Sequence, residues 1–288
     1  LLTFGTFIAW PAVRSMVLAF EQTFGPRTIA FVGTANFRYM VHDPFFWTAV
    51  GNTLLFTAAA VLVQIPAALG LALLLNRSDL RGRRFFRIVF FSPSIVGLAF
   101  VAIIYSLLLE RRTGIINASL HHLIPAWDPD FPWLENYVMP SLIVAVLWLS
   151  AGFYMVYFLA ALQNVSPELL DAANIHGAGS WQRFRHVTLP EIRPVLNIIL
   201  LLIVTGSFQL FELPYLLYND TNGNGPGNRA LTIVTYLYQT GGRSGDLGEA
   251  SASGWMLTLV LVGFALLQRR LTRNEELGGN LAPVACCV

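Results

Sequence analysis

Three side chains near residue 212 could bind a polar solute within an otherwise apolar stretch. Gln209, Glu212 and Tyr215 are spaced at i, i+3 and i+6, which places them on one face of a continuous helix. An amide, a carboxylate and an aromatic ring suit the hydroxyl groups and ring faces of a sugar, and an ionisable group in a membrane span must face water or a partner. The alternatives are hydrogen bonds between helices and an acid at the membrane interface.

A polar segment, residues 166–190, begins with the pattern of a helix start. Ser166 can cap a helix, and Pro167 fits the first helical position. Glu168 and Asp171 then place negative charge near the helix N-terminus, where the helix dipole favours it. We therefore predict a short helix from Pro167 onward.

The same segment continues with the pattern of a turn and a second helix. Gly177 suits the left-handed conformation that commonly ends a helix. Ser180 can cap a second short helix, and we expect Pro190 and Pro194 to break that helix where the next apolar stretch begins. Such a narrow unit suits docking into a groove of a partner protein. The alternative is an ordinary loop with an interfacial helix.

The composition argues against nucleotide, metal and catalytic chemistry in this chain. All 18 basic residues are arginine, so the G-x-x-x-x-G-K-[ST] phosphate loop, which needs a lysine, is absent. His121 and His122 have no third metal ligand at a useful spacing, and Cys286 and Cys287 are adjacent. A net charge of +2 is too small to indicate nucleic acid as a partner.

The elements that must position these residues are apolar helices. Hydrophobic residues make up 55% of the 288-residue sequence and charged residues only 12%, about half the charged fraction of soluble domains. Five uncharged stretches, and a sixth interrupted only by Arg14, approach or exceed the ~20 residues that cross a bilayer as a helix. We predict six membrane spans, at about residues 1–20, 48–76, 86–109, 138–162, 193–216 and 250–268.

The distribution of arginines predicts the orientation of these spans. Eleven arginines follow the second span, lie between the fourth and fifth, or follow the sixth, and six lie in the other loops. Because cytoplasmic loops carry the excess of basic residues, both termini and residues 166–190 are expected in the cytoplasm. On the opposite side, Asp43 and Pro44 form a helix-start signal before the aromatic residues 45–47.

The ends of the chain give further expectations. The transmembrane region is expected to comprise residues 1–273, and residues 274–288 are expected to be disordered. The chain does not begin with Met, and we expect part of its N-terminus to precede Leu1. A secretory signal peptide is the alternative for residues 1–20, although no small-residue cleavage pattern follows.

The polar segment also carries a resemblance to a known family. Asp171-Ala172-Ala173, Gly177, Val187 and Leu189-Pro190 match the E-A-A-x3-G-x9-I-x-L-P signature of ABC importer permeases, with Asp in place of Glu and Val in place of Ile. FVGTANFRYMVHDPFFWTAVGNT and FQLFELPYLLYND are similar to segments of the maltose-type permeases, the inner membrane components of binding-protein-dependent sugar transport. Apart from its tail, the chain resembles that family throughout.

The resemblance implies a fold and a function. The fold would be an all-α integral membrane protein with six transmembrane helices, a type I ABC importer permease with a cytoplasmic coupling helix. The chain would be the permease subunit of an ATP-driven importer that moves a sugar (mono-, di- or oligosaccharide) into the cytoplasm by alternating access. It would lie in a bacterial or archaeal inner membrane and would not be an enzyme.

The resemblance also implies partners and cofactors. The partners would be a second homologous permease, two ATP-binding subunits, an extracytoplasmic solute-binding protein, the sugar and membrane lipid. ATP and Mg²⁺ would bind the ATP-binding subunits, and this chain would bind no cofactor.

Residue roles follow from the same resemblance. Coupling to the ATPase is implied for Asp171, Ala172, Ala173, Gly177, Leu189 and Pro190, with Asp171 pairing with a cation of the ATPase and Gly177 forming the turn. The substrate path would include Ser150 and Phe153 in addition to Gln209, Glu212 and Tyr215. At each of these path positions, hydrogen bonding between helices remains the alternative.

Other functions remain open at this point. Permeases for amino acids, peptides or anions share the signature of residues 166–190. A self-contained secondary transporter would be expected to carry charged residues deep in its spans and inverted halves. Only Arg14 and Glu212 interrupt the predicted spans, and no clear internal repeat is visible. A membrane-embedded enzyme would need a catalytic set that the spans do not offer.

Overall fold

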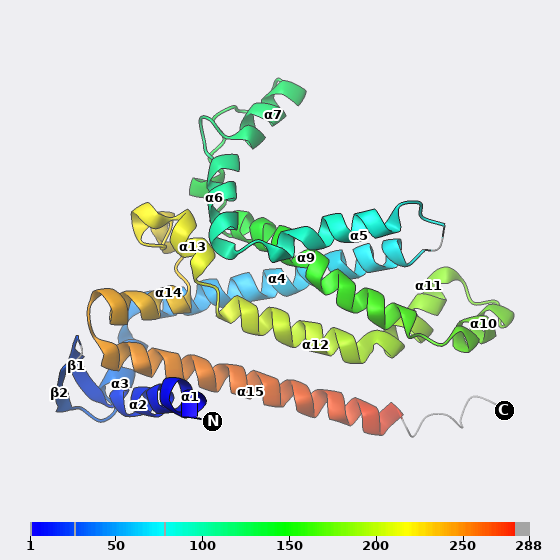
Figure 1. Ribbon diagram of the computed structural model, residues 1–288. Coiled ribbons are helices and arrows are strands. Elements are labelled where there is room, and N and C mark those ends of the chain that lie inside the picture. The colour runs from blue at the N-terminus through cyan, green and yellow to red at the C-terminus, as the bar shows by residue number, and fades with distance from the viewer. Residues whose placement is uncertain (1, 26, 78, 280–288) are drawn as a thin grey trace. The chain divides into compact units, whose positions relative to one another are not determined.

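The computed structural model of the chain describes residues 2–25, 27–77 and 79–279 (Figure 1). Two compact units divide the chain. The terminal unit comprises Leu1–Gly51 and Thr232–Val288, and the central unit comprises Asn52–Leu231. The termini therefore belong to one unit, and residues 166–190 belong to the other.

The terminal unit consists of helices and one β-hairpin. Its hairpin pairs β1 (Glu21–Phe24) with β2 (Arg27–Phe31) in antiparallel register. The sequence did not predict this hairpin. The helices are α1 (Leu2–Phe4), a π-helical turn (Gly5–Ala9), α2 (Trp10–Leu18), α3 (Ala35–His42), the first residues of α4 (Pro44–Asn76), α14 (Ile233–Tyr238), a π-helical turn (Gln239–Arg243) and α15 (Leu247–Gly279).

A close backbone contact fixes the hairpin to the start of α15. A Cβ atom at Gly248 would lie 2.0 Å from the carbonyl oxygen of Glu21, so only glycine fits there. The Gly248 N–H also donates to Thr23 Oγ1 at 3.1 Å. The buried Asn36 Nδ2 donates to the carbonyl oxygens of Ala19 (3.0 Å) and Glu21. These bonds satisfy backbone groups at the turn between α2 and β1.

The predicted start of α4 is confirmed. α4 begins at Pro44, and the Phe45 N–H donates to Asp43 Oδ1 at 2.9 Å. The carboxylate thus satisfies one of the free N–H groups at the helix N-terminus, and Pro44 needs no such bond. Of the aromatic residues that follow, Phe46 is buried, whereas Phe45 and Trp47 are exposed.

The regular secondary-structure elements in the described residues of the central unit are all helices or helical turns. Its elements are the remainder of α4, α5 (Arg83–Phe91), a 3-10 turn (Ser92–Ile95), α6 (Leu98–Leu108), α7 (Ile115–Leu123), α8 (Trp133–Asn136), α9 (Val138–Gln163), α10 (Pro167–Ile175), α11 (Ser180–Arg183), a π-helical turn (Phe184–Thr188), α12 (Leu189–Phe208), α13 (Glu212–Leu217) and 3-10 turns at Asn219–Thr221 and Pro226–Asn228.

α9 is the central helix of this unit, and it packs against α5, α6 and α12 (Figure 1). Its buried side chains include Leu142, Met155 and Phe158. The contact with α5 depends on Gly152, because a Cβ atom there would lie 1.8 Å from the carbonyl oxygen of Phe90. The backbones of α5 and α9 therefore touch at this point.

Among the described residues, the six predicted spans correspond to one short apolar helix, one bent pair of helices and four long apolar helices. Leu2–Leu18 is an apolar helix that is shorter than a full span, and Arg83–Ile95 with Leu98–Leu108 forms a pair bent by 101°. Four helices are long and apolar enough to cross a membrane: Pro44–Asn76, Val138–Gln163, Ser180–Phe208 and Leu247–Arg270.

The third predicted span is interrupted rather than continuous. The bend falls at the 3-10 turn around Pro93, which has no N–H to continue the helix. Two serines satisfy carbonyl groups that the interruption frees: Ser92 Oγ donates to the Val89 oxygen at 3.0 Å and Ser94 Oγ donates to the Phe91 oxygen at 2.6 Å. These hydroxyl groups thus take the place of backbone donors at the bend.

The prediction that Pro190 and Pro194 break the helix before the fifth span is wrong. Ser180–Phe208 is one helix, with a π-helical turn at Phe184–Thr188 in which the Leu189 N–H bonds to the Phe184 oxygen. A proline ring clashes with the carbonyl group four residues before it in an α-helix, and the wider π turn directly before Pro190 relieves that clash. Pro194 lies within the continuing helix.

The C-terminal helix is longer than expected. α15 continues to Gly279, so residues 274–279, which were expected to be disordered, lie within a helix. Residues 280–288, including Cys286 and Cys287, lie outside the described residues.

The contact at Gly152 leads to a stability prediction. We expect Gly152→Ala to destabilise the chain by about 1–3 kcal/mol, because the new methyl group must push α5 away from α9. Gly206→Ala in α12 is the matched control, since a Cβ atom there has no neighbour within 4 Å. Thermal unfolding in detergent should show a lower midpoint for Gly152→Ala alone. Equal midpoints for both variants would contradict the proposed backbone contact.

Candidate functional site

The segment 166–190 folds as two short helices joined by a tight turn. α10 starts at Pro167, as predicted, with Ser166 as the preceding residue, although the Ser166 side chain makes no capping hydrogen bond. Instead its carbonyl oxygen accepts from the Leu170 N–H at 3.4 Å. The start of α10 therefore depends on backbone geometry and on Pro167.

Gly177 ends α10 in the left-handed conformation that the sequence predicts. Its φ is +74°, and its N–H donates to the Asn174 oxygen while the Ala178 N–H donates to the Ala173 oxygen, both at 3.0 Å. This pair of bonds is the Schellman motif, which satisfies the last carbonyl groups of a helix. A Cβ atom at Gly177 would have no neighbour within 4 Å, so glycine is required here by the backbone angle and not by space within the chain.

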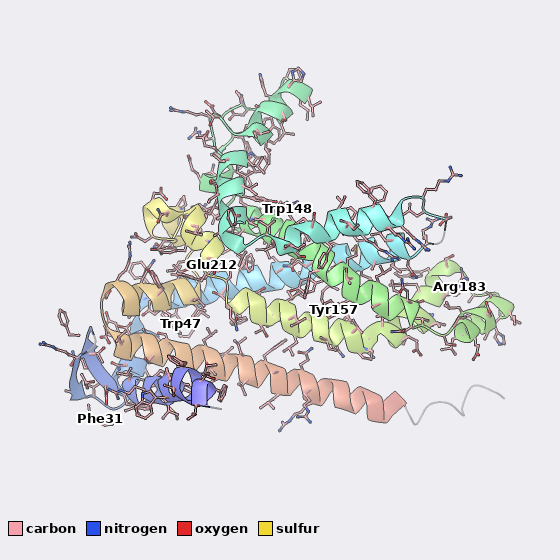
Figure 2. All side chains as sticks on the ribbon, in the orientation of Figure 1. Phe31, Trp47, Trp148, Tyr157, Arg183 and Glu212 are labelled. Atoms are coloured by element: carbon pink, nitrogen blue, oxygen red, sulfur yellow. The ribbon has the colours of Figure 1, made fainter. Side chains whose placement is uncertain are left out.

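The second short helix is capped differently from the prediction. Gly179, and not Ser180, precedes α11, and the Gly179 N–H donates to Gln182 Oε1 at 2.8 Å. Arg183 joins the two helices, because its guanidinium group donates to Asn174 Oδ1 at the end of α10 and to Ser180 Oγ (Figure 2). The turn is therefore held by side chains on both of its sides.

The segment is anchored on one side and exposed on the other. Leu170 and Leu189 pack against the core of the central unit. By contrast, Ile175 is 86% exposed and Trp181 is 68% exposed, and the Asp171 side chain is exposed on α10. We call the exposed side chains Leu169, Asp171, Ala172, Ile175 and Trp181 the docking face. Two large apolar side chains beside a carboxylate indicate a surface that a partner covers.

Ser150 in α9 is engaged within the helix bundle. Its Oγ lies 2.9 Å from Gln64 Oε1 in α4 and 2.7 Å from the Val146 oxygen. Gln64 is only 2% exposed, so its amide requires a partner inside the protein. This contact fits the alternative of a helix–helix hydrogen bond at Ser150. The sequence analysis overlooked Gln64, although an amide within a long uncharged stretch is a detectable signal.

Phe153 belongs to an aromatic group on the exposed side of α9. Its ring centroid lies 5.0 Å from that of Tyr157 and 5.5 Å from that of Tyr154, and about 37% of the residue is exposed. Tyr157 and Trp148 are also exposed on this helix (Figure 2). α9 thus offers aromatic ring faces outside the core of its unit.

The prediction that Gln209, Glu212 and Tyr215 share one helix face is wrong. α12 ends at Phe208, Gln209 is its C-cap, and α13 begins at Glu212 after an irregular Phe211 (φ −137°, ψ −56°). Pro214 accounts for the break, because its ring would clash with the Leu210 carbonyl group in a continuous helix. Glu212 (Figure 2) and Gln209 are exposed. The Tyr215 ring stacks on that of Phe211, with ring centroids 5.0 Å apart.

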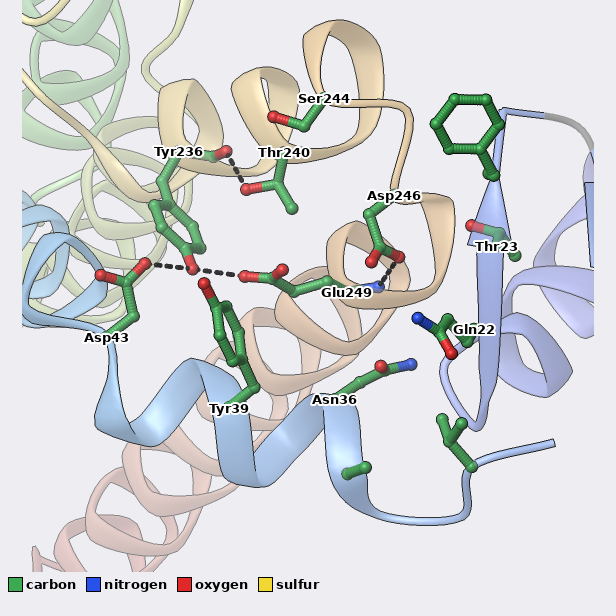
Figure 3. Close-up of a pocket in the computed structure, with 13 residues that line it drawn as sticks. Gln22, Thr23, Asn36, Tyr39, Asp43, Tyr236, Thr240, Ser244, Asp246 and Glu249 are labelled. Atoms are coloured by element: carbon green, nitrogen blue, oxygen red, sulfur yellow. Dashed lines mark hydrogen bonds between the residues drawn. The ribbon is translucent and has the colours of Figure 1, made fainter. Parts of the chain in front are cut away.

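A polar hollow in the terminal unit was also not predicted from the sequence. It has a volume of about 680 Å³ and lies between β1, α3, α14 and α15 (Figure 3). At its wall, the Tyr236 hydroxyl lies 2.8 Å from Asp43 Oδ2 and 2.7 Å from Glu249 Oε1. The signal in the sequence was the presence of acids in segments that flank apolar helices. Asp43 and Glu249 are too far apart in the sequence for any spacing rule to predict that both contact Tyr236.

Metal-binding side chains do not converge in the part of the chain that the structure describes. No group of three or more His, Cys, Asp or Glu side chains in this part is placed to hold a metal ion. His121 Nδ1 lies 2.9 Å from the Trp127 carbonyl oxygen. This backbone contact accounts for one of the two histidines that drew notice in the sequence.

Comparison with known proteins adds a family and a fold. Residues 64–274 match the model of the family described as binding-protein-dependent transport system inner membrane component. The chain is 34% identical over 274 residues to the arabinooligosaccharides transport system permease protein AraP of Bacillus subtilis, covering 94% of this chain and 85% of the relative. It is 32% identical over 274 residues to the lactose transport system permease protein LacF of Rhizobium radiobacter, covering 94% and 90%.

A solved structure matches the fold over nearly the whole chain. It is the crystal structure of a bacterial ABC transporter involved in the import of the acidic polysaccharide alginate. The TM-score is 0.81 at 26% sequence identity, and the match covers 95% of this chain and 92% of that chain.

Proposed function

Because the chain belongs to the family of binding-protein-dependent transport system inner membrane components, we propose that it is the permease subunit of an ATP-driven importer that moves a sugar into the cytoplasm. The relatives named for arabinooligosaccharides and lactose, and the fold shared with an alginate importer, support a carbohydrate as the solute. The observation that carries the proposal is the segment 166–190, whose signature residues form a narrow two-helix unit with an exposed docking face.

The assembly in this proposal has separate subunits for binding and hydrolysis. A second homologous permease completes the pathway, two ATP-binding subunits hold ATP and Mg²⁺, and an extracytoplasmic solute-binding protein delivers the sugar. The absence of lysine, and hence of a lysine-containing phosphate loop, supports placing the nucleotide on partner subunits. The excess of arginines on one side supports an inner-membrane orientation with both termini and the docking face in the cytoplasm.

ATP hydrolysis would be coupled to transport through residues 166–190, because this segment is anchored to the core of the central unit. The docking face would lie in a cleft of an ATP-binding subunit, with Asp171 paired to a cation of that subunit and Ala172 and Ala173 permitting close approach. Leu170 and Leu189 join the segment to the core that contains α9 and α12. A displacement of the segment when the ATP-binding subunits close would therefore move these helices, which is the basis of alternating access.

The substrate path is proposed along α9 and the break between α12 and α13. Phe153 offers an exposed ring, and Gln209 and Glu212 present an amide and a carboxylate at the helix break. Tyr215 stacks on Phe211 beside them. Ser150 would contribute indirectly, by holding α9 to α4 through Gln64.

The turn at Gly177 provides a test of coupling. Gly177→Phe should insert into the membrane but lose sugar uptake, because the side chain meets no atom of the chain itself but protrudes from the turn beside the docking face, in addition to straining the backbone at its positive φ. Gly227→Phe is the matched control, since Gly227 also has a positive φ (+61°) and no neighbour within 4 Å. Uptake and sugar-stimulated ATP hydrolysis are measured in proteoliposomes. Normal uptake by Gly177→Phe would contradict docking through this segment.

The composition of the complex tests the proposed function itself. Affinity purification of the chain from its native membrane should bring down an ATP-binding protein and a second permease. The purified complex, reconstituted in vesicles, should transport a radiolabelled oligosaccharide only under two conditions. ATP must be present on the side of the membrane that carries the ATP-binding subunits, and a solute-binding protein must be present on the opposite side. Transport by this chain alone would identify a secondary transporter, and import of amino acids but not sugars would identify a different solute.

The carboxylate at the helix break provides a test of the substrate path. We expect Glu212→Gln to raise the KM for sugar about tenfold, because hydrogen bonds to a charged group contribute about 1.5–3 kcal/mol. The ATP hydrolysis rate without sugar should remain unchanged. Asp220→Asn, another exposed acid in the loop after α13, serves as the control. If both variants have the wild-type KM, Glu212 is an interfacial acid and not part of the path.

A further inference from the structure

Asp43, Tyr236 and Glu249 make two short oxygen–oxygen contacts, but the Tyr236 hydroxyl has only one hydrogen to donate. The Tyr236 hydroxyl lies 2.8 Å from Asp43 Oδ2 and 2.7 Å from Glu249 Oε1 (Figure 3). A hydroxyl group carries one hydrogen and can donate one such bond, and ionised carboxylates only accept. Two ionised acids would therefore leave one short oxygen–oxygen contact without a proton.

We propose that Asp43, Tyr236 and Glu249 form a proton-binding site, in which one carboxyl proton is held in a chain of three oxygen atoms. The site joins the start of α4 to α14 and to the first turn of α15, all within the terminal unit. Its ligand is a proton from the adjoining hollow, which has a volume of about 680 Å³ and is open to water.

The second hydrogen bond of Asp43 indicates which acid holds the proton. Asp43 Oδ1 accepts from the Phe45 N–H at the start of α4, where the helix dipole favours a negative charge. Asp43 therefore accepts at both of its oxygens, from the Phe45 N–H through Oδ1 and from the Tyr236 hydroxyl through Oδ2. Glu249 then carries the extra proton and donates it to the Tyr236 oxygen, so all three groups are satisfied.

Tyr236 itself does not supply a second negative charge. Burial, together with hydrogen bonds to the two carboxyl groups beside it, raises the pKa of the Tyr236 hydroxyl well above its usual value. The hydroxyl consequently keeps its proton throughout the pH range in which proteins remain folded. The only proton that the site exchanges is the carboxyl proton.

The surroundings of Glu249 favour its neutral form. Asp246 precedes α15 and accepts from the Glu249 N–H at 3.0 Å, so a carboxylate already occupies the positive end of this helix. Gln22 and Thr23 on β1 and Asn36 and Tyr39 on α3 complete the wall, and the described residues that line the hollow include no arginine or histidine. Arg14 on α2 is paired with Glu21 at 2.8 Å. Arg38 and His42 on α3 are exposed, and His42 Nδ1 lies 2.7 Å from the Arg38 backbone carbonyl oxygen.

The proton links stability to pH in an unusual direction. A glutamate in the unfolded chain releases its proton at about pH 4.3, whereas the folded site releases it at higher pH. Between these two titrations the folded state binds more protons than the unfolded chain. The free energy of unfolding therefore falls as the pH rises through the titration of the folded site. In the proposed orientation the hollow opens on the outer side of the membrane, so the site would respond to external pH.

Infrared spectroscopy tests the site directly. Spectra of the full chain in its complex should show the carbonyl stretch of a protonated carboxylic acid at neutral pH, and Glu249→Gln should remove this band. Asp43→Asn should remove the band as well. The Asn amide can donate a hydrogen bond to the Tyr236 oxygen, and the Tyr236 hydroxyl can then donate its hydrogen to an ionised Glu249. Asn at residue 43 still caps α4, so this variant folds. Glu135→Gln, in the exposed pair with Arg111, should keep the band.

Thermal unfolding supplies a second measurement on the same variants. As the pH rises above the range in which a free glutamate titrates, the unfolding temperature of the wild type should fall relative to that of Glu249→Gln, whose side chain cannot ionise. Absence of the protonated-acid band in the wild type overturns the proposal. Loss of the band in Glu249→Gln but not in Asp43→Asn overturns it too, because Glu249 would then be protonated without the chain of three oxygen atoms.

Discussion

Backbone hydrogen bonding in an apolar environment is the constraint on which this structure depends. Inside a bilayer no water replaces a missing backbone bond, so a helix can be interrupted only where other groups take over. The interruption at Pro93 is satisfied by Ser92 and Ser94, and the strain at Pro190 is relieved by a π-helical turn. The chain bends or stops where its own side chains permit, and these positions lie beside the segments proposed for coupling and for the solute.

The same constraint explains why the segment proposed for coupling, residues 166–190, can be small. α9 ends at Gln163, just before this segment, and α12 begins at Leu189, within it. The Schellman motif at Gly177 and the Arg183–Asn174 contact satisfy its internal groups. Its remaining side chains are therefore available to a partner. A compact unit that is anchored to the core through Leu170 and Leu189 can pass a displacement on to the helices that it joins.

Local signals in the sequence predicted local structure well, whereas long-range contacts escaped them. The cap at Asp43, the start at Pro167 and the left-handed Gly177 follow from the chemistry of one to three neighbouring residues, and the structure confirms them. The prolines were harder to interpret, because Pro190 is accommodated by a π turn, while Pro214 accompanies a complete break that separates Gln209 from Glu212. The Gln64–Ser150 bond and the Asp43–Tyr236–Glu249 contact join residues too distant in sequence for any spacing rule.

The backbone contact at Gly152 has a mechanical consequence. Two helices whose main chains touch cannot slide or rotate against each other by the small side-chain adjustments that normally absorb such motion. α5 and α9 should therefore translate as a single body. The arginine-rich start of α5 would then travel with α9, so each transport cycle would shift a cluster of positive charge relative to the lipid headgroups. The conformational equilibrium of this chain would thereby become sensitive to the surface charge of its membrane.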